Sequence, residues 1–373
     1  MEKVSVYLRN RYEGPSCYYR VYQYIEDMDQ IDFHIHDAVS KRMFRYNLDY
    51  KGAKIGKVIL QSIMFIEIVI RRIISLLSDL RWKPDIIIIS RTIIPRKFPR
   101  MIQFLFLKLF NKTKVIWDFD DYIFEEEISE RESEFLQKYS SKIIVTNNFL
   151  KNKVNENAQK KVILLPTTDK NYLNKKERDF IHRKRLESYK NTIKIIWVGT
   201  SSNINNLKLI IKQLEQFDIN MKREQRSVEL IVVCNKEFEH NGQIKIKNVR
   251  WSRKNAIKYL KQAHIGIMPL ANSEYAKGKG GFKLIQYLGM GLPIIASKVG
   301  FNKEIVVPEV GYLIDDRIES DKWLNAIEQL ACNEEIWKSK SKNAYEFWEN
   351  HFSYEHNLQT WITILKDNRR IIK

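Results

Sequence analysis

The sequence predicts an α/β protein with two domains, each built around a parallel sheet. The chain has 373 residues, and domains most often contain about 100–150 residues, so the length suits two separate cores. Short apolar runs bounded by glycine or proline alternate with segments of helical periodicity, a pattern typical of parallel strands covered by helices. The two halves share this strand–helix alternation without a repeated sequence period.

The first half contains a series of candidate strands. They lie at Val4–Leu8, Asp32–His36, Pro84–Ser90, Lys114–Trp117, Lys142–Thr146 and Lys161–Leu165. Pro84–Ser90 is the clearest, because proline begins the run and four isoleucines fill it. Helices are expected at Cys17–Tyr24 and Val58–Leu80. Residues 169–191 are polar, strongly charged and poor in large apolar side chains, which favours a linker.

Polar side chains follow several of these strands at the carboxyl end, where open α/β sheets bind ligands. Gly14, Ser16 and Arg20 come after the first strand, and Arg91 follows Pro84–Ser90. These residues are therefore candidates for a binding site. The Ser16 hydroxyl is equally well placed to cap the helix that follows, so a plain turn and cap explains the same residues.

Three carboxylates, Asp118, Asp120 and Asp121, follow the strand Lys114–Trp117. A strand followed by Asp-x-Asp resembles the first motif of haloacid-dehalogenase-type phosphatases, although Tyr122 stands where that motif usually has Thr or Val. The acids also suit a helix N-terminus, where the dipole favours negative charge. Both interpretations stay open beside a third that follows from the resemblance described below.

The second half repeats the alternation. Strands are expected at Ile193–Val198, Val228–Cys234, Val249–Trp251, Ile265–Leu270 and Leu292–Ala296, and helices at Asn206–Phe217, Asn255–Ala263 and Phe282–Met290. Two loops precede helices and are rich in small residues: Gly199-Thr200-Ser201, and Lys277-Gly278-Lys279-Gly280-Gly281. Backbone N–H groups at such a helix start can bind a phosphate, and Lys277, Lys279 and Lys283 add positive charge. A solvated surface turn is the alternative.

Composition limits the possible partners. There are 64 Lys and Arg against 45 Asp and Glu, a net charge of +19, which favours anionic partners, although lysines scattered over the surface explain part of it. The sequence contains no basic run with interleaved stacking aromatics, so nucleic acid is not expected. Cys17, Cys234 and Cys332 lie far apart without a CxxC pair, which argues against a cysteine zinc cluster and favours a reducing cytosol.

Two apolar stretches bear on membrane contact. Val58–Leu77 is interrupted by Glu67, Arg71 and Arg72, which indicates an amphipathic helix rather than a membrane span. Arg96–Lys108 mixes bases with bulky apolar groups; it suits either an anionic membrane surface or a core helix with charged ends that reach water. The polar-ended start, MEKVSVYLRN, is expected to be a strand and not a signal peptide.

A longer pattern in the second half resembles a known family. It runs through Gly281–Leu288, Gly291–Ser297, Val299–Gly300, Asn302, Glu304–Val306 and Gly311–Leu313. This pattern is similar to the nucleotide-sugar-binding half of retaining GT-B glycosyltransferases of the bacterial surface-polysaccharide type, the family 4-like enzymes of glycosyl transferases group 1. The resemblance is strong over residues 190–315 and weaker in the first half.

The resemblance implies a GT-B architecture, in which two Rossmann-like domains face a cleft. Residues 1–170 would form an acceptor domain, 171–191 a linker and 192–347 the nucleotide-sugar domain. Residues 348–373 would form a C-terminal helix that crosses back to the N-terminal domain. The same resemblance implies a third interpretation of the Asp cluster: it would face the donor and bind the acceptor or transfer a proton.

The resemblance also implies roles for individual residues. Asp118 and Asp121 would be catalytic, and Gly14, Ser16, Arg20 and Arg91 would lie on the acceptor side. The donor would be bound by Gly199, Thr200, Ser201, Trp251, Lys277, Lys279, Gly280, Gly281, Phe282, Lys283 and Gln286. The family often has two glutamates eight positions apart in the donor site, and here Gly278 and Gln286 occupy those positions. Gly278 cannot hold a sugar through a side chain.

The implied activity is transfer of a sugar from a nucleotide-sugar donor to a lipid-linked glycan or surface-polysaccharide acceptor, with retention and without a metal or cofactor. An anionic membrane surface is a further expected partner, and the expected location is the cytoplasm, peripheral on the inner face of the cell membrane. Because of Gly278, a non-catalytic GT-B relative that binds a nucleotide sugar or a partner enzyme is the alternative.

Overall fold

The computed structural model describes residues 1–171, 173–315 and 321–367. The chain divides into two compact units, and each is described by itself. Unit 1 contains Met1–Thr167 together with the C-terminal residues from Glu355, and unit 2 contains Thr168–Tyr354. Both are α/β units with a six-stranded parallel sheet, as the sequence predicts.

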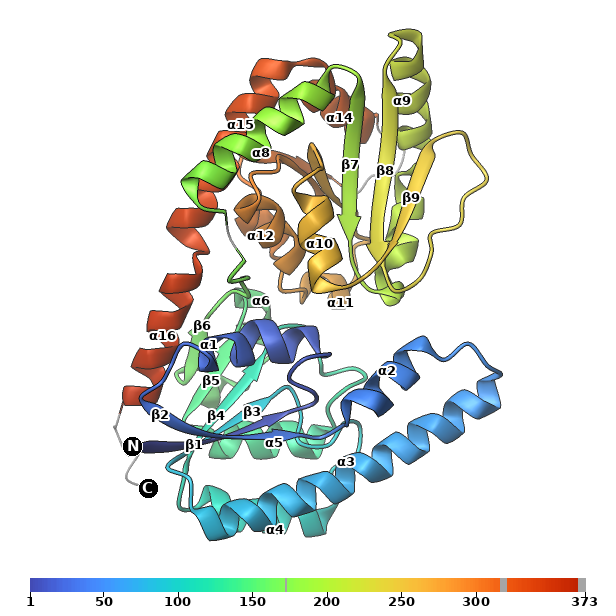
Figure 1. Cartoon of the computed structure of the whole chain (residues 1–373). Helices are drawn as coiled ribbons and strands as arrows, with labels where there is room; N and C mark the ends of the chain where they lie inside the picture. The colour runs from blue at the N-terminus through green and yellow to red at the C-terminus, as the bar shows by residue number, and fades with distance from the viewer. Residues whose placement is uncertain (172, 316–320, 368–373) are drawn as a thin grey trace. The chain divides into compact units, whose positions relative to one another are not determined.

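The sheet of unit 1 has the strand order β2-β1-β3-β4-β5-β6 (Figure 1). Its strands are β1 (Glu2–Leu8), β2 (Ile31–Asp37), β3 (Ile86–Ser90), β4 (Lys114–Phe119), β5 (Lys142–Val145) and β6 (Val162–Leu164). All five neighbouring pairs are parallel. β1 lies between β2 and β3, so the chain adds β2 on one side of β1 and then adds the later strands on the other side. Ligands in open α/β sheets bind at such a switch point, beyond the carboxyl ends of the strands.

Helices cover both faces of this sheet. They are η1 (Cys17–Tyr22), α1 (Gln23–Ile25), α2 (Lys41–Asp49), α3 (Lys54–Trp82), α4 (Arg100–Phe110), α5 (Glu130–Tyr139), α6 (Asn148–Asn152) and α7 (Glu156–Gln159). In Figure 1, α3, α4 and α5 lie along one face. The isoleucines of β3 are all buried because their side chains alternate between two covered faces; Ile87 and Ile89 pack into the core beneath α3 and α4.

The sheet of unit 2 has the order β12-β11-β10-β7-β8-β9. Its strands are β7 (Thr192–Val198), β8 (Ser227–Cys234), β9 (Lys245–Arg250), β10 (Ile265–Met268), β11 (Ile294–Ser297) and β12 (Gly311–Ile314). Counted from β7, this is the 3-2-1-4-5-6 order of dinucleotide-binding folds, with its switch point between β7 and β10. β7 serves both faces: Ile195 and Trp197 enter one core cluster, and Ile196 and Val198 enter the other.

The helices of unit 2 separate into two layers. They are α8 (Lys175–Tyr189), η2 (Ser201–Leu209), α9 (Ile211–Arg223), α10 (Arg253–Leu260), α11 (Glu274–Lys277), α12 (Phe282–Gly289), α13 (Asn302–Ile305), α14 (Lys322–Cys332) and α15 (Glu334–His351). One core cluster contains residues of α9 and α14, and the other contains residues of α10, α12 and α15. Within the described ranges, none of the helices combines the length and the apolarity that crossing a bilayer requires.

The segment expected as a linker, residues 171–191, contains the helix α8 and belongs to unit 2. Its charged composition conceals a buried arginine. Arg185 donates to the carbonyl oxygens of Leu260 and Met290, both at 2.9 Å, and these two residues lie at the C-terminal ends of α10 and α12. The positive side chain therefore satisfies helix-terminal carbonyls and holds α8 in place.

The C-terminal segment expected as one helix, 348–373, is divided. Its first residues complete α15, and α16 (Tyr354–Lys366) follows; residues 368–373 lie outside the described residues. From Glu355 onward the segment belongs to unit 1. Asn357 donates to the Pro166 carbonyl at 2.7 Å, and Lys114 Nζ donates to the Ile364 carbonyl at 2.6 Å. These bonds tie α16 to the strands of unit 1.

Candidate functional site

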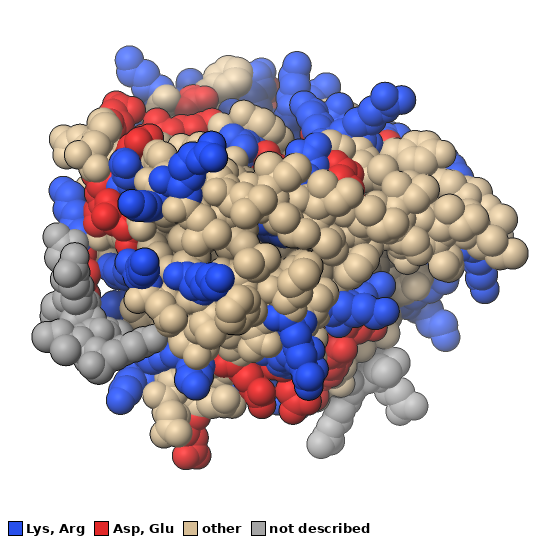
Figure 2. Space-filling model, turned by 90° about the horizontal axis from the view of Figure 1, so that it is seen from below, with Lys and Arg blue, Asp and Glu red and all other residues tan. Residues whose placement is uncertain are grey.

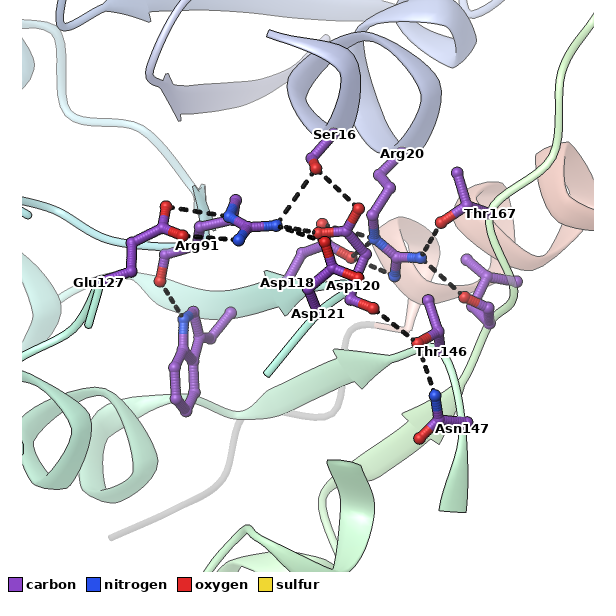
Figure 3. Close-up of polar contacts among 12 residues, drawn as sticks. Ser16, Arg20, Arg91, Asp118, Asp120, Asp121, Glu127, Thr146, Asn147 and Thr167 are labelled. Carbon is purple, nitrogen blue, oxygen red and sulfur yellow. Dashed lines mark hydrogen bonds and ion pairs between the residues drawn. The ribbon is translucent and has the colours of Figure 1, made fainter. Parts of the chain in front are cut away.

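The first cluster lies at the switch point of unit 1, where η1 meets the end of β4 (Figure 3). Arg20 and Asp118 form an ion pair, with Nη2–Oδ1 at 2.6 Å and Nε–Oδ2 at 3.0 Å. Both side chains are only 1% exposed. Arg20 Nη1 also donates to the Leu165 carbonyl at 2.9 Å and to Thr167 Oγ1 at 3.0 Å. This geometry suits a charge-assisted pair that fixes the loop after β1 against β4.

Arg91 is the second cation of this cluster. Its φ of +64° is unusual for a residue other than glycine. The Arg91 N–H donates to the Asp118 carbonyl at 2.7 Å, and the Arg91 carbonyl accepts from Trp117 Nε1 at 2.9 Å, so both backbone groups of Arg91 hold the turn. The guanidinium forms two bonds with Glu127, at 3.0 and 2.6 Å, and a further bond with Asp120. The turn after β3 thereby directs a positive charge into the acidic cluster.

The carboxylates of the cluster differ in their access to solvent. The exposed side-chain fraction is 1% for Asp118, 12% for Asp120 and 32% for Asp121. Burial alone would raise the pKa of Asp120, but the positive charges of the two arginines hold this pKa below its ordinary value. Asp121 Oδ2 lies 3.7 Å from Arg91 Nη1. Asp121 is therefore the acid of this cluster that an incoming molecule reaches first.

Ser16 and Gly14 shape the loop after β1. The Ser16 hydroxyl donates to Asp120 Oδ2 at 2.7 Å instead of capping η1, so the capping expectation is wrong. Gly14 donates to the Asn10 carbonyl at 3.1 Å, and a Cβ atom at position 14 would approach that oxygen to 2.9 Å. This glycine is needed for a close turn, which brings Ser16 to the acidic cluster.

Two of the three interpretations of the acidic cluster lose their basis. The next helix, α5, begins only at Glu130 and is capped by the Ser129 hydroxyl, so the acids do not cap a helix. A phosphohydrolase would use Asp118 and Asp120 to hold a cation. Instead, each of these carboxylates is already paired with an arginine. The arrangement suits a positioned charge network better than a metal-binding pair.

The second cluster lies at the switch point of unit 2, at the end of β7. A Cβ atom on Gly199 would come within 2.5 Å of the Trp197 ring and 3.0 Å of Lys283 Cε. Only glycine fits here without displacing these side chains. Lys283, in the first turn of α12, has its Nζ 5.4 Å from the centre of the Trp197 ring. The structure thus brings together Gly199 and Lys283, which are far apart in the sequence.

The glycine-rich loop opens α12 as expected. Gly281 is the N-cap residue and has a φ of +64°, the left-handed conformation that glycine adopts without strain. A Cβ atom there would also lie 2.3 Å from Ile305 Cδ1. Gly280 and Phe282 flank it, so this loop places consecutive backbone N–H groups at the positive end of the α12 dipole.

The loop lysines have different surroundings. Lys277 ends α11 and pairs with Glu274 at 2.8 Å. Lys279 is largely buried, and its Nζ lies 4.3 Å from the centre of the Tyr275 ring. A buried ammonium group over an aromatic face is held in one position, which favours directed binding over a freely solvated lysine.

Other expected donor residues have structural partners. The Ser201 N–H donates to Asn235 Oδ1 at 2.9 Å, and Thr200 Oγ1 lies 2.9 Å from Ser202 Oγ. The backbone N–H of Trp251 donates to the Cys234 carbonyl at 2.9 Å, and its side chain packs against the core of unit 2. These contacts fix the backbone of the loops that follow β7 and β9.

Gln286 is placed away from the loop glycines, in the second turn of α12. Its side chain is largely buried, and Nε2 donates to Asp169 Oδ2 at 3.0 Å. Asp169 also accepts the N–H of Asn171 at 2.9 Å. The amide at the usual glutamate position therefore anchors the segment that enters unit 2.

Two residues of these clusters were missed in the sequence. Asn235 follows β8 at its carboxyl end, so the rule that identified Arg91 would have found it. Glu127 gave no local signal, because it lies 36 positions from Arg91 in an irregular segment.

One group of described residues has side chains that could hold a metal ion: His34, His36 and Asp79. It belongs to unit 1 and shares no residue with the acidic cluster there. Asp79 Oδ2 accepts the Tyr7 hydroxyl at 2.7 Å, and Asp79 Oδ1 lies 2.9 Å from His36 Nε2. These bonds account for the burial of Asp79.

Comparisons with known proteins agree with this architecture. Residues 192–333 match the family model described as glycosyl transferases group 1. The sequence has no match among curated proteins. Sucrose-phosphate synthase from Thermosynechococcus elongatus has a similar structure, with 12% identity, a TM-score of 0.62 and 98% of each chain covered.

Two further solved structures are similar over the same length. HepE from Anabaena, in complex with UDP, shares 12% identity at a TM-score of 0.63, covering 98% of this chain and 99% of that one. A glycosyltransferase from Rickettsia africae shares 13% identity at a TM-score of 0.62, covering 98% of each chain. These likenesses establish the GT-B fold, and the match to glycosyl transferases group 1 covers residues 192–333 of unit 2.

Proposed function

We propose that this protein transfers a sugar from a nucleotide-sugar donor to a lipid-linked glycan or surface-polysaccharide acceptor, with retention at the anomeric carbon and without a metal ion. The observation that carries the proposal is the switch point of unit 2. There, Gly199 and Lys283 meet at the end of β7, within the residues that match the group 1 family model. Glycine loops with positive charge at helix starts are suited to a pyrophosphate.

In this proposal unit 2 holds the donor. Backbone N–H groups of the loops at Gly199–Ser201 and Gly280–Phe282 bind the pyrophosphate. Lys277, Lys279 and Lys283 stabilise the negative charge that builds on the leaving phosphate. Trp251 lies at the base side, and Gln286 acts indirectly by fixing Asp169. UDP is the first nucleotide to test, because HepE has been solved with UDP.

Unit 1 would hold the acceptor. Asp121 is the candidate to contact the acceptor hydroxyl, since it is the most exposed acid of the cluster. Asp118, Arg20, Arg91, Ser16 and Gly14 would act through the charge network that positions it. Retaining transfer of this kind needs no nucleophile from the protein: the acceptor attacks from the face that the phosphate leaves, and that phosphate takes the proton. The protein then contributes positioning and electrostatic stabilisation.

A lipid-linked acceptor implies work at the inner face of the cell membrane. The excess of basic residues, 64 against 45 acidic, supports an anionic surface as a partner. The alternative is a non-catalytic relative that binds a nucleotide sugar or a partner enzyme. It is favoured by Gly278, which ends α11 where the family often has a glutamate.

The test is incubation of the purified protein with a panel of UDP-, GDP- and ADP-sugars without divalent metal. Nucleotide release is measured with and without lipid extract from the source cells. Release from one donor, stimulated by the extract, supports the transferase and names its base and sugar; the anomeric configuration of the product then tests retention. Binding without release from any donor would favour the non-catalytic alternative.

A substitution tests the phosphate site. Lys279→Ala is expected to weaken donor binding about tenfold or more, because a charge-assisted contact contributes roughly 1.5–3 kcal/mol. Lys212→Ala is the control, since Lys212 is an exposed lysine of α9 in the same unit. Equal donor affinity of the two variants would remove Lys279 from the phosphate site.

A further inference from the structure

An apolar stripe runs along the solvent side of α3. Its members are Ile55, Val58, Ile59, Ile63, Ile66, Ile70, Ile74 and Leu77, which are 49–76% exposed. From Ile55 onward the stripe recurs every three or four residues, which keeps it on one helix face over about 33 Å, at 1.5 Å per residue. The opposite face of α3 carries Leu60, Met64, Ile68 and Leu76 into the core of unit 1. The helix is therefore apolar on both sides, although only one side is covered.

The neighbouring helix extends the stripe. Met101 and Phe104 of α4 are 63% and 56% exposed, and α3 and α4 contact each other. Lys108 Nζ lies 4.7 Å from the centre of the Phe104 ring, so its stem follows the apolar surface while its charge stays at the edge. Figure 2 looks onto this side of unit 1 and shows a broad surface of uncharged residues, with Lys and Arg along it and groups of Asp and Glu at its edges. We call this surface the α3–α4 face.

Charges around the α3–α4 face have one predominant sign. Residues 86–117 contain no Asp or Glu. The exposed cations on the two helices and their flanks are Lys51, Lys54, Arg71, Arg81, Lys83, Arg96, Lys97, Arg100, Lys108 and Lys112. The flank after α3 also has one exposed acid, Asp85. α3 itself has two acids: Asp79 is buried, and Glu67 bonds to Arg71 Nε at 2.8 Å. An apolar stripe bordered by cations is complementary to the headgroups and acyl boundary of an anionic bilayer.

We propose that the α3–α4 face docks on an anionic membrane surface, with the isoleucine stripe in the acyl boundary and the flanking cations at the phosphate groups. The helices lie on the bilayer rather than crossing it. The charges favour lipid over a second copy of this chain, because a two-fold contact through this face would bring two sets of like charges together. Docking would bring the protein to a lipid-linked acceptor, and this consequence rests on the proposed function.

The experiment is flotation of the full chain with vesicles of phosphatidylcholine alone or mixed with phosphatidylglycerol. Wild type is expected to float with the mixed vesicles and to stay unbound with the neutral ones. Ile66→Glu with Ile74→Glu is expected to lower the partition coefficient about tenfold or more. The matched control is Leu164→Glu with Phe180→Glu, since these exposed apolar residues lie on β6 and α8, away from the face; it should stay within about twofold.

The charge arm uses Arg100→Gln with Lys108→Gln, expected to lower binding about fivefold for each cation. Its control, Lys212→Gln with Lys254→Gln, removes the same charge from exposed positions of unit 2 and should change binding little. Far-UV circular dichroism verifies that every variant is folded. Equal binding to neutral vesicles, or an equal loss in the matched controls, overturns the proposal.

Two readouts separate this inference from the proposed function. Sedimentation without lipid tests the second copy: self-association that Ile66→Glu with Ile74→Glu abolishes would overturn membrane docking in favour of a dimer. Nucleotide release from the donor is measured on the same samples. Vesicle binding without any transfer would leave the docking face standing and count against the proposed function, whereas transfer without vesicle binding would do the reverse.

Discussion

The two switch points of this protein differ in the kind of residue that forms them. In unit 1, long side chains fill the carboxyl ends of the strands, and buried acids are paired with Arg20 and Arg91. In unit 2, the corresponding place is built on Gly199 and Gly281, where a Cβ atom would lie within 2.5 Å of a neighbouring side chain. The unit 1 site is therefore a network of paired charges. The unit 2 site is a set of glycine loops whose backbone can approach a ligand closely.

This difference suggests that the unit 1 cluster contributes mainly to stability and the unit 2 loops mainly to ligand binding. Breaking a buried ion pair leaves a charge without its partner, which is costly to the fold. Adding a side chain to the glycine loops strains the backbone locally and blocks the approach of a ligand. We therefore expect substitutions at the unit 1 cluster to affect folding first, and those at the unit 2 loops to affect donor binding first.

The largest effect is expected for Arg20→Met, which leaves Asp118 buried without its cation. Unit 1 should lose about 3–5 kcal/mol of unfolding free energy, measured by hydrogen exchange of the β4 amides. Adding Asp118→Leu should restore much of the loss, because the uncompensated charge is then gone as well. A loss below about 1 kcal/mol in the single variant would show that the pair does not hold unit 1 together.

The two units should respond to pH in opposite directions. Burial lowers the pKa of His264 in unit 2 from 6.5 to about 3; its Nδ1 accepts the Lys194 N–H at 2.9 Å. In acid the unfolded chain binds a proton that the folded unit does not. The contribution of His264 to the stability of unit 2 is therefore fully present above pH 6.5 and is lost as the pH falls towards 3; the loss should reach about 2 kcal/mol at pH 5.

Burial raises the pKa of Glu132 in unit 1 from 4.5 to about 8. Here the folded unit keeps a proton that the unfolded chain has released. Unit 1 should therefore lose stability as the pH rises from 4.5 to 8, by at most roughly 1.4 kcal/mol per pH unit. Hydrogen exchange of β8 and β3 amides, corrected for the intrinsic rate, measures both slopes. Glu132→Gln should flatten the slope of unit 1 alone; parallel slopes in wild type would contradict the assignment.

Gly281→Ala tests the backbone requirement of unit 2. Its left-handed φ should cost about 1–2 kcal/mol with alanine, and the new methyl group would meet Ile305. Donor affinity, measured by calorimetry, should fall together with the stability of unit 2. Gly242→Ala is the comparison, because Gly242 lacks the left-handed φ of Gly281 and its added carbon would meet the side-chain ends of Glu215 and His240. Indistinguishable affinities in these two variants would deny the loop its role.

The smallest effect is expected for Ser16→Ala, which removes the bond donated to Asp120 and the longer bond accepted from Arg91 Nη1, both at a partly exposed edge of the unit 1 network. The expected loss is about 1 kcal/mol of unit 1 stability, with donor affinity unchanged. Ser62→Ala is the comparison, because its exposed hydroxyl donates to the Val58 carbonyl within α3. A loss no greater than that of Ser62→Ala would remove Ser16 from the network.

The sequence predicted what local patterns encode. β3 is a run of isoleucines, and the glycine loop before α12 is visible as glycine. Partnerships between distant charged residues were not predictable, because they depend on which strands become neighbours. Arg91 and Glu127, 36 positions apart, illustrate this limit. α8 was missed for a related reason: Arg185 signals solvent in a sequence, but in the fold it lies buried against helix-terminal carbonyls.

The most direct test of the account measures donor affinity and transfer separately in Lys283→Ala and Asp121→Asn, with the donor that the nucleotide-sugar panel identifies. We predict that Lys283→Ala weakens donor binding about tenfold or more, whereas Asp121→Asn leaves donor affinity unchanged and lowers transfer. The opposite assignment, with Asp121→Asn weakening the donor and Lys283→Ala leaving its affinity intact, would contradict the division of labour between the two switch points.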